Sequence, residues 1–179
     1  MYSNFKHLTT LLILLILVSC YQNPNTHQIK TIEDLERYCD ESNKNLEKIN
    51  ISKCRKSIKI AEFNILRLEQ EKLDSLDINL IYFEYREYLN SINNLRKLLI
   101  NYKSLQESLI LNKLQLKNMK LDYTNSSMER IDLNNHLLNE TEIIKNTSTQ
   151  TQEVINLIQF EIKNLETLNN TIETFINEK

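Results

Sequence analysis

Residues 81–123 read IYFEYREYLNSINNLRKLLINYKSLQESLILNKLQLKNMKLDY, and their periodicity predicts one long helix. Apolar or aromatic side chains recur at alternating spacings of three and four, which is the period of a single helix face. We call these positions the seam: Ile81, Tyr85, Tyr88, Ile92, Leu95, Leu98, Tyr102, Leu105, Leu109, Asn112, Leu116, Met119 and Tyr123. A helix over residues 77–123 would be about 70 Å long. Such a helix is stable in water only when its seam packs against partner helices.

The composition of the chain supports an all-helical fold. Its 179 residues include no glycine and no tryptophan, and the one proline is Pro24. Glycine is required by phosphate-binding loops, tight hairpin turns and nucleophile elbows, so these motifs are excluded. Folds built on β-sheets use glycine at many turns, and a chain without it is therefore predicted to be all-α.

Upstream of the seam, Thr31 and Asp34 resemble a helix-capping pair and predict a helix start at residue 31. The helix that follows carries its own seam at Ile32, Leu35, Cys39, Ser42, Leu46 and Ile49. A turn is predicted within residues 43–52, which are rich in Asn. A hairpin centred near residues 46–47 would set Cys39 opposite Cys54, whereas a turn at 50–52 would not. The sequence leaves the exact turn open.

A second helix follows, with Cys54, Ile58, Ala61, Ile65 and Leu68 on one face. The phase of the apolar pattern then changes at residues 74–77, which predicts a kink or a tight turn. A single helix over residues 52–123 with a shifted seam is the alternative. After the long helix, residues 124–127 interrupt the pattern, and Ser126 or Ser127 can cap the next helix.

The last helix is predicted to reach the C-terminus. Residues 146–152 contain few apolar side chains and predict a bend or a weak stretch, after which a seam resumes at Ile155, Ile158, Ile162, Leu165, Asn169, Ile172 and Ile176. Taken together, the patterns predict an all-α fold for residues 31–179. We expect a single domain, an elongated antiparallel helical bundle with coiled-coil character, made of three to four helices.

The N-terminal residues have the layout of a secretory signal. Lys6 and His7 precede an apolar run over residues 8–18. This run is shorter than the roughly 20 apolar residues that a membrane-spanning helix needs. Leu17-Val18-Ser19-Cys20 resembles the lipobox of bacterial lipoproteins, in which the signal is cut before a cysteine that carries a diacylglycerol. The resemblance implies a cleaved signal over residues 1–19, a lipidated Cys20 and a flexible tether over residues 20–30. An ordinary cleavable signal and an uncleaved anchor are the alternatives.

Two further cysteines, Cys39 and Cys54, are predicted to form a disulfide, because an exported protein more often pairs two remaining cysteines than leaves them free. Free thiols are the alternative. No metal site is predicted, since His27 and His136 show no ligand spacing with either cysteine. No catalytic residues and no cofactor are predicted either, because no nucleophile–base arrangement can be identified. The net charge of −2 and the scattered basic residues give no sign of nucleic-acid binding.

The aromatic cluster around Tyr82, Tyr85 and Tyr88, which also holds Phe83, is the one local anomaly. Its rings either fill a wide part of the bundle or form an exposed anchor patch for a partner, since tyrosine is enriched at interfaces. Asn112, a polar residue within a leucine-rich seam, is predicted to set the register of the helices.

The lipobox and the helical body rich in Lys, Asn, Ile and Leu are similar to small helical lipoproteins of AT-rich bacteria, including spirochaetal surface antigens. The similarity implies a cell-envelope location, at the outer membrane, and a non-catalytic role in binding a host or envelope protein. A structural envelope spacer or self-assembling coiled coil is the alternative. For that alternative, Lys179 is similar to the terminal lysine that joins the murein-linked lipoprotein to peptidoglycan. The sequence does not determine whether the chain forms a homo-oligomer.

Overall fold

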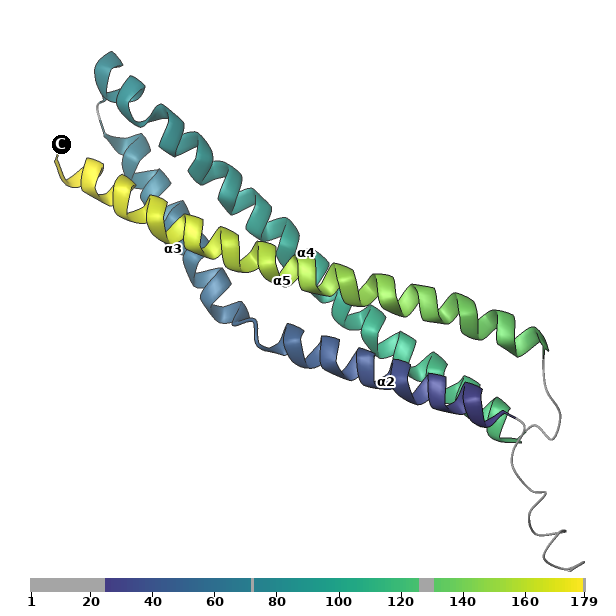
Figure 1. Ribbon diagram of the computed structural model, residues 1–179. Coiled ribbons are helices and arrows are strands. Elements are labelled where there is room, and N and C mark those ends of the chain that lie inside the picture. The colour runs from purple at the N-terminus through teal and green to yellow at the C-terminus, as the bar shows by residue number, and fades with distance from the viewer. Residues whose placement is uncertain (1–24, 72, 126–130, 179) are drawn as a thin grey trace, which may run out of the picture.

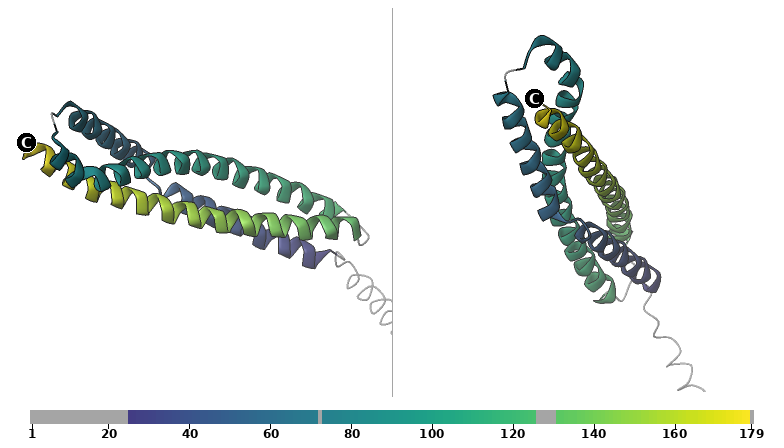
Figure 2. Two further views of the ribbon diagram at one scale, coloured as in Figure 1. Left: turned by 90° about the horizontal axis from the view of Figure 1, so that it is seen from above. Right: turned by 90° about the vertical axis from the view of Figure 1, so that its left-hand side faces the viewer.

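The computed structural model describes residues 25–71, 73–125 and 131–178. This part of the chain is all-α, with helices α2 (Thr26–Glu47), α3 (Ile51–Gln70), α4 (Ser75–Asn125) and α5 (Ile131–Asn177). α2 and α3 follow one another as a single bent leg, and α4 and α5 form the two other legs (Figures 1 and 2). α4 runs antiparallel to the other helices. The predicted elongated antiparallel bundle is confirmed.

The two ends of the bundle differ in what they hold. The proximal end contains Asn25, the end of α4 and the start of α5 (Figure 1). The distal end contains the turn between α3 and α4 and the C-terminal end of α5. Because α4 has 51 residues, these ends are separated by about 75 Å at 1.5 Å per residue.

α2 begins five residues earlier than predicted, at Thr26 instead of Thr31. The Thr31 hydroxyl donates to the carbonyl oxygen of His27 at 3.1 Å, so it bonds within the helix and does not cap its start. Asn25 precedes the helix and is buried, with its Nδ2 donating to the carbonyl oxygen of Tyr123 at 3.2 Å. Residues 26–30, predicted as part of a flexible tether, are therefore helical.

A turn does lie within residues 43–52, but it does not make a hairpin. α2 ends at Glu47, and the side chain of Asn50 caps α3 by accepting from the backbone N–H of Lys53 at 2.9 Å. The chain then continues toward the distal end (Figure 1), because both helices pack on α4 and α5 and not on each other.

The predicted disulfide between Cys39 and Cys54 is not formed. The Cα atoms of these residues lie more than 8 Å apart, beyond the 4.4–6.8 Å that a disulfide spans. Both thiols are free and buried. The physical reason is the end-to-end arrangement of α2 and α3, which places the two cysteines at different heights along the bundle.

The phase change at residues 74–77 marks the start of α4, after a break that separates it from α3. The alternative of one continuous helix over residues 52–123 is therefore wrong. Asp74 Oδ1 accepts from the backbone N–H groups of Leu76 and Asp77 at 2.8 and 2.9 Å. Asp77 Oδ2 accepts in return from the backbone N–H of Asp74 at 3.3 Å. This reciprocal arrangement works like a capping box and fixes the start of α4.

The long helix has the extent and the seam that its sequence predicts. Its buried apolar residues are Ile81, Tyr88, Ile92, Leu95, Leu98, Leu105, Leu109, Leu116, Met119 and Tyr123. The remaining three seam positions, Tyr85, Tyr102 and Asn112, are half-buried. α4 ends at Asn125, at the predicted interruption, whereas the expected caps Ser126 and Ser127 lie outside the described residues.

α5 is continuous through residues 146–152, where a bend or a weak stretch was predicted. The hydroxyls of Thr147 and Thr151 donate to the carbonyl oxygens of Ile143 and Thr147, at 2.9 and 2.8 Å. Both threonines are buried. Because the helix itself satisfies these hydroxyls, the polar side chains can enter the bundle without breaking α5.

A polar layer divides the hydrophobic core into two clusters. Ser42 Oγ donates to Ser148 Oγ at 2.9 Å, and Asn112 Nδ2 donates to Thr147 Oγ1 at 3.4 Å. On the proximal side lies a cluster with Ile32 and Leu116, and on the distal side a larger cluster with Leu46 and Leu109. Ser42 and Asn112, the polar positions in the seams of α2 and α4, therefore both lie in this layer.

Candidate functional site

The structure separates the three tyrosines that the sequence grouped as a candidate binding patch. Tyr88 is completely buried, and its hydroxyl donates to Asn169 Oδ1. Asn64 Nδ2 in turn lies 3.5 Å from the Tyr88 hydroxyl and donates to Glu173 Oε1 at 3.2 Å. Burial raises the pKa of Tyr88 to about 12, which keeps the phenol protonated. Tyr88 therefore fills the bundle and belongs to no surface patch.

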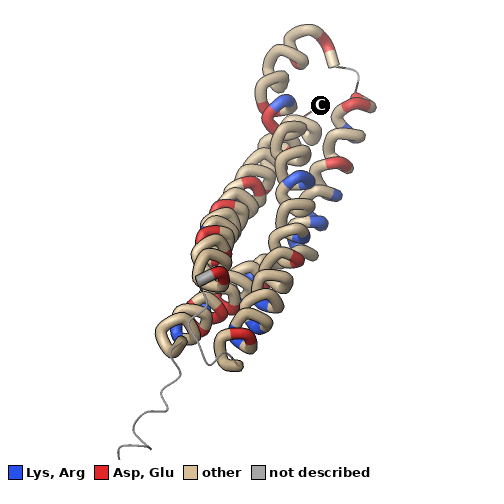
Figure 3. Tube along the Cα trace, turned by 90° about the vertical axis from the view of Figure 1, so that its right-hand side faces the viewer, with Lys and Arg blue, Asp and Glu red and all other residues tan. Residues whose placement is uncertain are grey.

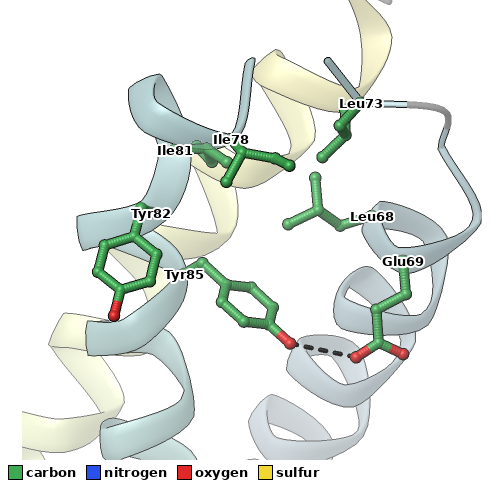
Figure 4. A pocket seen from close by; sticks show the side chains of 7 residues that line it. All are labelled: Leu68, Glu69, Leu73, Ile78, Ile81, Tyr82 and Tyr85. Atoms are coloured by element: carbon green, nitrogen blue, oxygen red, sulfur yellow. Dashed lines mark hydrogen bonds between the residues drawn. The ribbon is translucent and has the colours of Figure 1, made fainter. Parts of the chain in front are cut away.

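Tyr85 is half-buried and links two helices. Its hydroxyl on α4 donates to Glu69 Oε1 on α3 at 3.1 Å (Figure 4). Burial, and then the hydrogen bond to Glu69, raise the pKa of Tyr85. The ring forms one wall of a cavity, and its polar end is already occupied by Glu69.

That cavity, which we call the distal groove, has a volume of about 210 Å³. Its lining comes from α3, α4 and the turn between them, as the close view shows (Figure 4). The lining residues are Leu68, Glu69, Leu73, Ile78, Ile81, Tyr82 and Tyr85. Apart from one carboxylate and two phenol hydroxyls, these side chains are apolar, so the distal groove suits an apolar guest.

Beside the groove, the start of α4 exposes a set of large apolar side chains that we call the distal patch: Leu76, Ile78, Leu80, Tyr82 and Phe83. The exposed fractions of Leu76 and Leu80 reach 72%, and those of Tyr82 and Phe83 are 58% and 69%. These residues are exposed where the first turns of α4 diverge from the rest of the bundle (Figure 1). Grouped exposed apolar side chains of this kind mark interaction surfaces more often than isolated ones do.

Sequence reasoning identified Tyr82 and Phe83 but missed Leu76, Ile78 and Leu80. Their spacing of two places successive side chains on opposite sides of a helix, so the three cannot all face one core. That spacing was the available signal. The distal groove, by contrast, depends on how α3 folds back on α4, which the sequence alone did not define.

Acidic side chains outnumber basic ones in the segment that builds the distal site, and Glu69 and Glu84 line its two hollows. Residues 67–87 contain six acidic side chains and three basic ones. The acidic residues are Glu69, Glu71, Asp74, Asp77, Glu84 and Glu87. Basic side chains are concentrated instead in the first half of α3, at Lys53, Arg55, Lys56 and Lys59. Figure 3 shows how Lys and Arg (blue) and Asp and Glu (red) are distributed along the bundle. The distal end is therefore an apolar surface with an acidic rim.

The two cysteines are poorly suited to chemistry. Burial, followed by the charge of Asp40, raises the pKa of Cys39 to about 11. Burial also raises the pKa of Cys54. Because the thiolate is the reactive form, both side chains are held in their unreactive state at neutral pH.

Among the described residues, no group of three His, Cys, Asp or Glu side chains is placed to hold a metal ion. Nor does any helix in residues 25–71, 73–125 and 131–178 have the length and apolar composition that crossing a membrane requires. The predicted signal over residues 1–19 and the predicted lipidation site Cys20 lie outside the described residues, as does Lys179.

Comparison of the chain with protein-family models, with curated proteins and with solved structures found no match. The fold and the site therefore define the molecule by themselves: an elongated antiparallel helical bundle with an apolar, acid-rimmed surface at one end.

Proposed function

We propose that this chain is a lipid-anchored bacterial envelope protein that binds another protein through its distal end. The observation that carries the proposal is the distal patch, in which five large apolar side chains are exposed around the first turns of α4. Two of them, Tyr82 and Phe83, are aromatic, and aromatic side chains dominate the energetics of protein interfaces.

The position of the patch fits an anchored molecule. Anchoring at Cys20 would attach lipid only five residues before Asn25, at the proximal end. The distal patch lies at the opposite end of α4 (Figure 1). A rod held at one end presents its other end farthest from the membrane surface, where a partner has free access.

The anchoring half of the proposal is tested by Cys20→Ala. The substitution removes the thiol that would carry the diacylglycerol, so the variant should remain an uncleaved precursor and incorporate no labelled fatty acid. Acyl labelling of the variant at the wild-type level would rule out Cys20 as the lipidation site.

The binding half is tested by Tyr82→Ser combined with Phe83→Ser in the full chain. Proteins that co-purify with the wild-type chain from cross-linked native cells should be lost from this variant, whose bundle melts as wild type does. The matched control combines Leu157→Ser with Phe160→Ser, two exposed apolar residues of α5 with exposed fractions of 49% and 61%. Identical sets of proteins from all three chains would contradict the proposal.

A self-assembling coiled coil or envelope spacer is the second candidate, and one observation favours it. The outer face of α4 exposes a further apolar stripe at Ile100, Ile110, Leu111, Leu114 and Leu121. Lateral association of rods would cover that stripe. Sedimentation of Leu111→Lys combined with Leu114→Lys distinguishes the two candidates, because the spacer predicts wild-type oligomers that this variant loses.

A further inference from the structure

We infer that the distal groove and distal patch bind an amphipathic segment of another protein whose apolar side chains are flanked by lysine or arginine. This inference rests on the proposed function and adds the chemistry of the partner. Two independent features of the distal end carry it: the shape and lining of the groove, and the sign of the charge around it.

The groove is built to hold an anchoring side chain. Its volume of about 210 Å³ is smaller than the roughly 300–1,000 Å³ of small-molecule pockets. Leu68, Leu73 and Ile78 face the same space in Figure 4, and Tyr82 borders it. A large apolar side chain that enters from solvent would contact both α3 and α4.

A second depression, with a mixed polar and apolar lining, lies on the other side of α4. It has a volume of about 490 Å³ and shares Ile81 with the distal groove. Leu80 and Phe175 contribute apolar walls, and Glu84 and Glu178 contribute carboxylates. The rest of the lining, beyond the shared Ile81, is polar and comes from Asn170, Thr171 and Thr174 of α5. The start of α4 therefore lies between two hollows, which favours an extended or helical segment with more than one apolar side chain as the occupant.

Charge selects among possible occupants. The six carboxylates of residues 67–87 outnumber three basic side chains, and Glu69 lies on the wall of the groove itself. A partner with basic residues beside its apolar anchors complements this rim and is steered toward it. Anionic lipid headgroups would be repelled by the same carboxylates. A second copy docked end to end would bring two acidic rims together, so like charges disfavour it.

The test measures binding of designed peptides of about 15 residues, long enough to form an amphipathic helix. The probes are a Leu/Lys peptide, its Leu/Glu counterpart and a Ser/Lys peptide that has the charge without the apolar side chains. The full chain is held in phosphatidylcholine nanodiscs on a surface plasmon resonance chip, and the signal from empty nanodiscs is subtracted.

We expect the Leu/Lys peptide to bind at least about tenfold more tightly than the Leu/Glu peptide, and the Ser/Lys peptide to show no binding over the same range. The preference should shrink when NaCl is raised from about 10 mM to about 500 mM, because screening weakens the attraction of exposed charges. Tyr82→Ser combined with Phe83→Ser should abolish binding of the Leu/Lys peptide.

Charge reversal provides the sharpest control. Glu71→Lys combined with Glu84→Lys should reverse the preference toward the Leu/Glu peptide, since both carboxylates lie at the distal end. Glu142→Lys combined with Glu153→Lys changes the total charge equally at exposed positions of α5 and should leave the preference unchanged.

Equal affinity for the Leu/Lys and Leu/Glu peptides would overturn the inference, as would binding that neither double substitution at the distal end alters. A dimer that forms in sedimentation only when the distal patch is intact would identify a second copy as the occupant, and would also overturn it. If cells yield a partner that depends on Phe83 while the peptide preference fails, the proposed function stands and only the chemistry of the partner is wrong.

Discussion

Cys39 and Cys54 illustrate how much a single residue's role depends on the helix that carries it. Both cysteines lie on predicted helix faces, and both are buried as those faces require. Their pairing, however, depended on a hairpin at residues 43–52. The chain continues in the same direction there, so each thiol packs as a small apolar side chain in its own cluster.

The first prediction follows from that separation. Iodoacetamide added to the unfolded protein without reductant should label both Cys39 and Cys54, because no disulfide protects them. In the folded protein at neutral pH both should react slowly, since burial raises the pKa of each thiol. Peptide mapping by mass spectrometry checks both results, and a disulfide-linked peptide containing the two cysteines would contradict the structure.

The second prediction concerns pH. The pKa of Cys39 rises from an ordinary 9.0 to about 11 on folding. Below pH 9 the thiol is protonated in both states and its contribution to stability is complete. Between pH 9 and 11 the unfolded chain loses the proton more readily than the folded one, so stability should fall as pH rises. Urea melts over this range should show a steeper loss for wild type than for Cys39→Ala, and equal slopes would refute the assignment.

At the scale of elements, the periodic apolar pattern was the most reliable guide to the helices, because its period is a direct consequence of helix geometry. Where apolar side chains recur without interruption, in α4 and in the second half of α5, the predicted helices match the observed ones closely. Boundaries were less predictable. The Thr31 hydroxyl bonds to a carbonyl within the helix instead of capping its start. The hydroxyls of Thr147 and Thr151 likewise donate to carbonyls of α5. These polar residues therefore mark neither a helix start nor a bend.

The third prediction tests the seam of α4. Leu95 is completely buried and Leu109 nearly so. Leu95→Asp or Leu109→Asp would bury an unpaired charge, and should cost more than the roughly 2–5 kcal/mol typical of Leu→Ala in cores. Lys97→Asp changes an exposed residue two positions from Leu95 and should be nearly silent. If the two seam variants unfold at the wild-type temperature by circular dichroism, α4 is not packed as described.

The fourth prediction tests the polar layer. Asn112 donates to Thr147 in a half-buried position, next to the contact between Ser42 and Ser148. Asn112→Leu would make the seam of α4 apolar throughout, so the melting temperature should stay equal or rise while the register becomes less uniquely defined. Sedimentation should then show additional oligomers. A variant that is clearly less stable and stays in the wild-type state would show that the layer contributes stability and not specificity.

At the scale of the whole molecule, the arrangement of the legs positions the candidate site. The sequence predicted an aromatic anomaly at residues 82–88 and could not say which rings were exposed. Tyr88 is completely buried, whereas Tyr82 on the same helix is largely exposed and borders the distal groove. The distal groove needs α3 to fold back beside α4 at Asp74, a three-dimensional relationship that no local pattern encodes.

The central claim is that the distal end of an anchored rod binds a partner protein. Site-specific photo-crosslinking in native cells tests it most directly, with a photoreactive phenylalanine analogue placed at one position of the full chain at a time. Phe83 samples the distal patch, Phe160 the exposed side of α5, and Leu138 the proximal end, and all three side chains are well exposed. The account predicts an adduct with another protein from position 83 and none from positions 160 and 138. Adducts of equal yield from all three positions, or none from position 83, would contradict it.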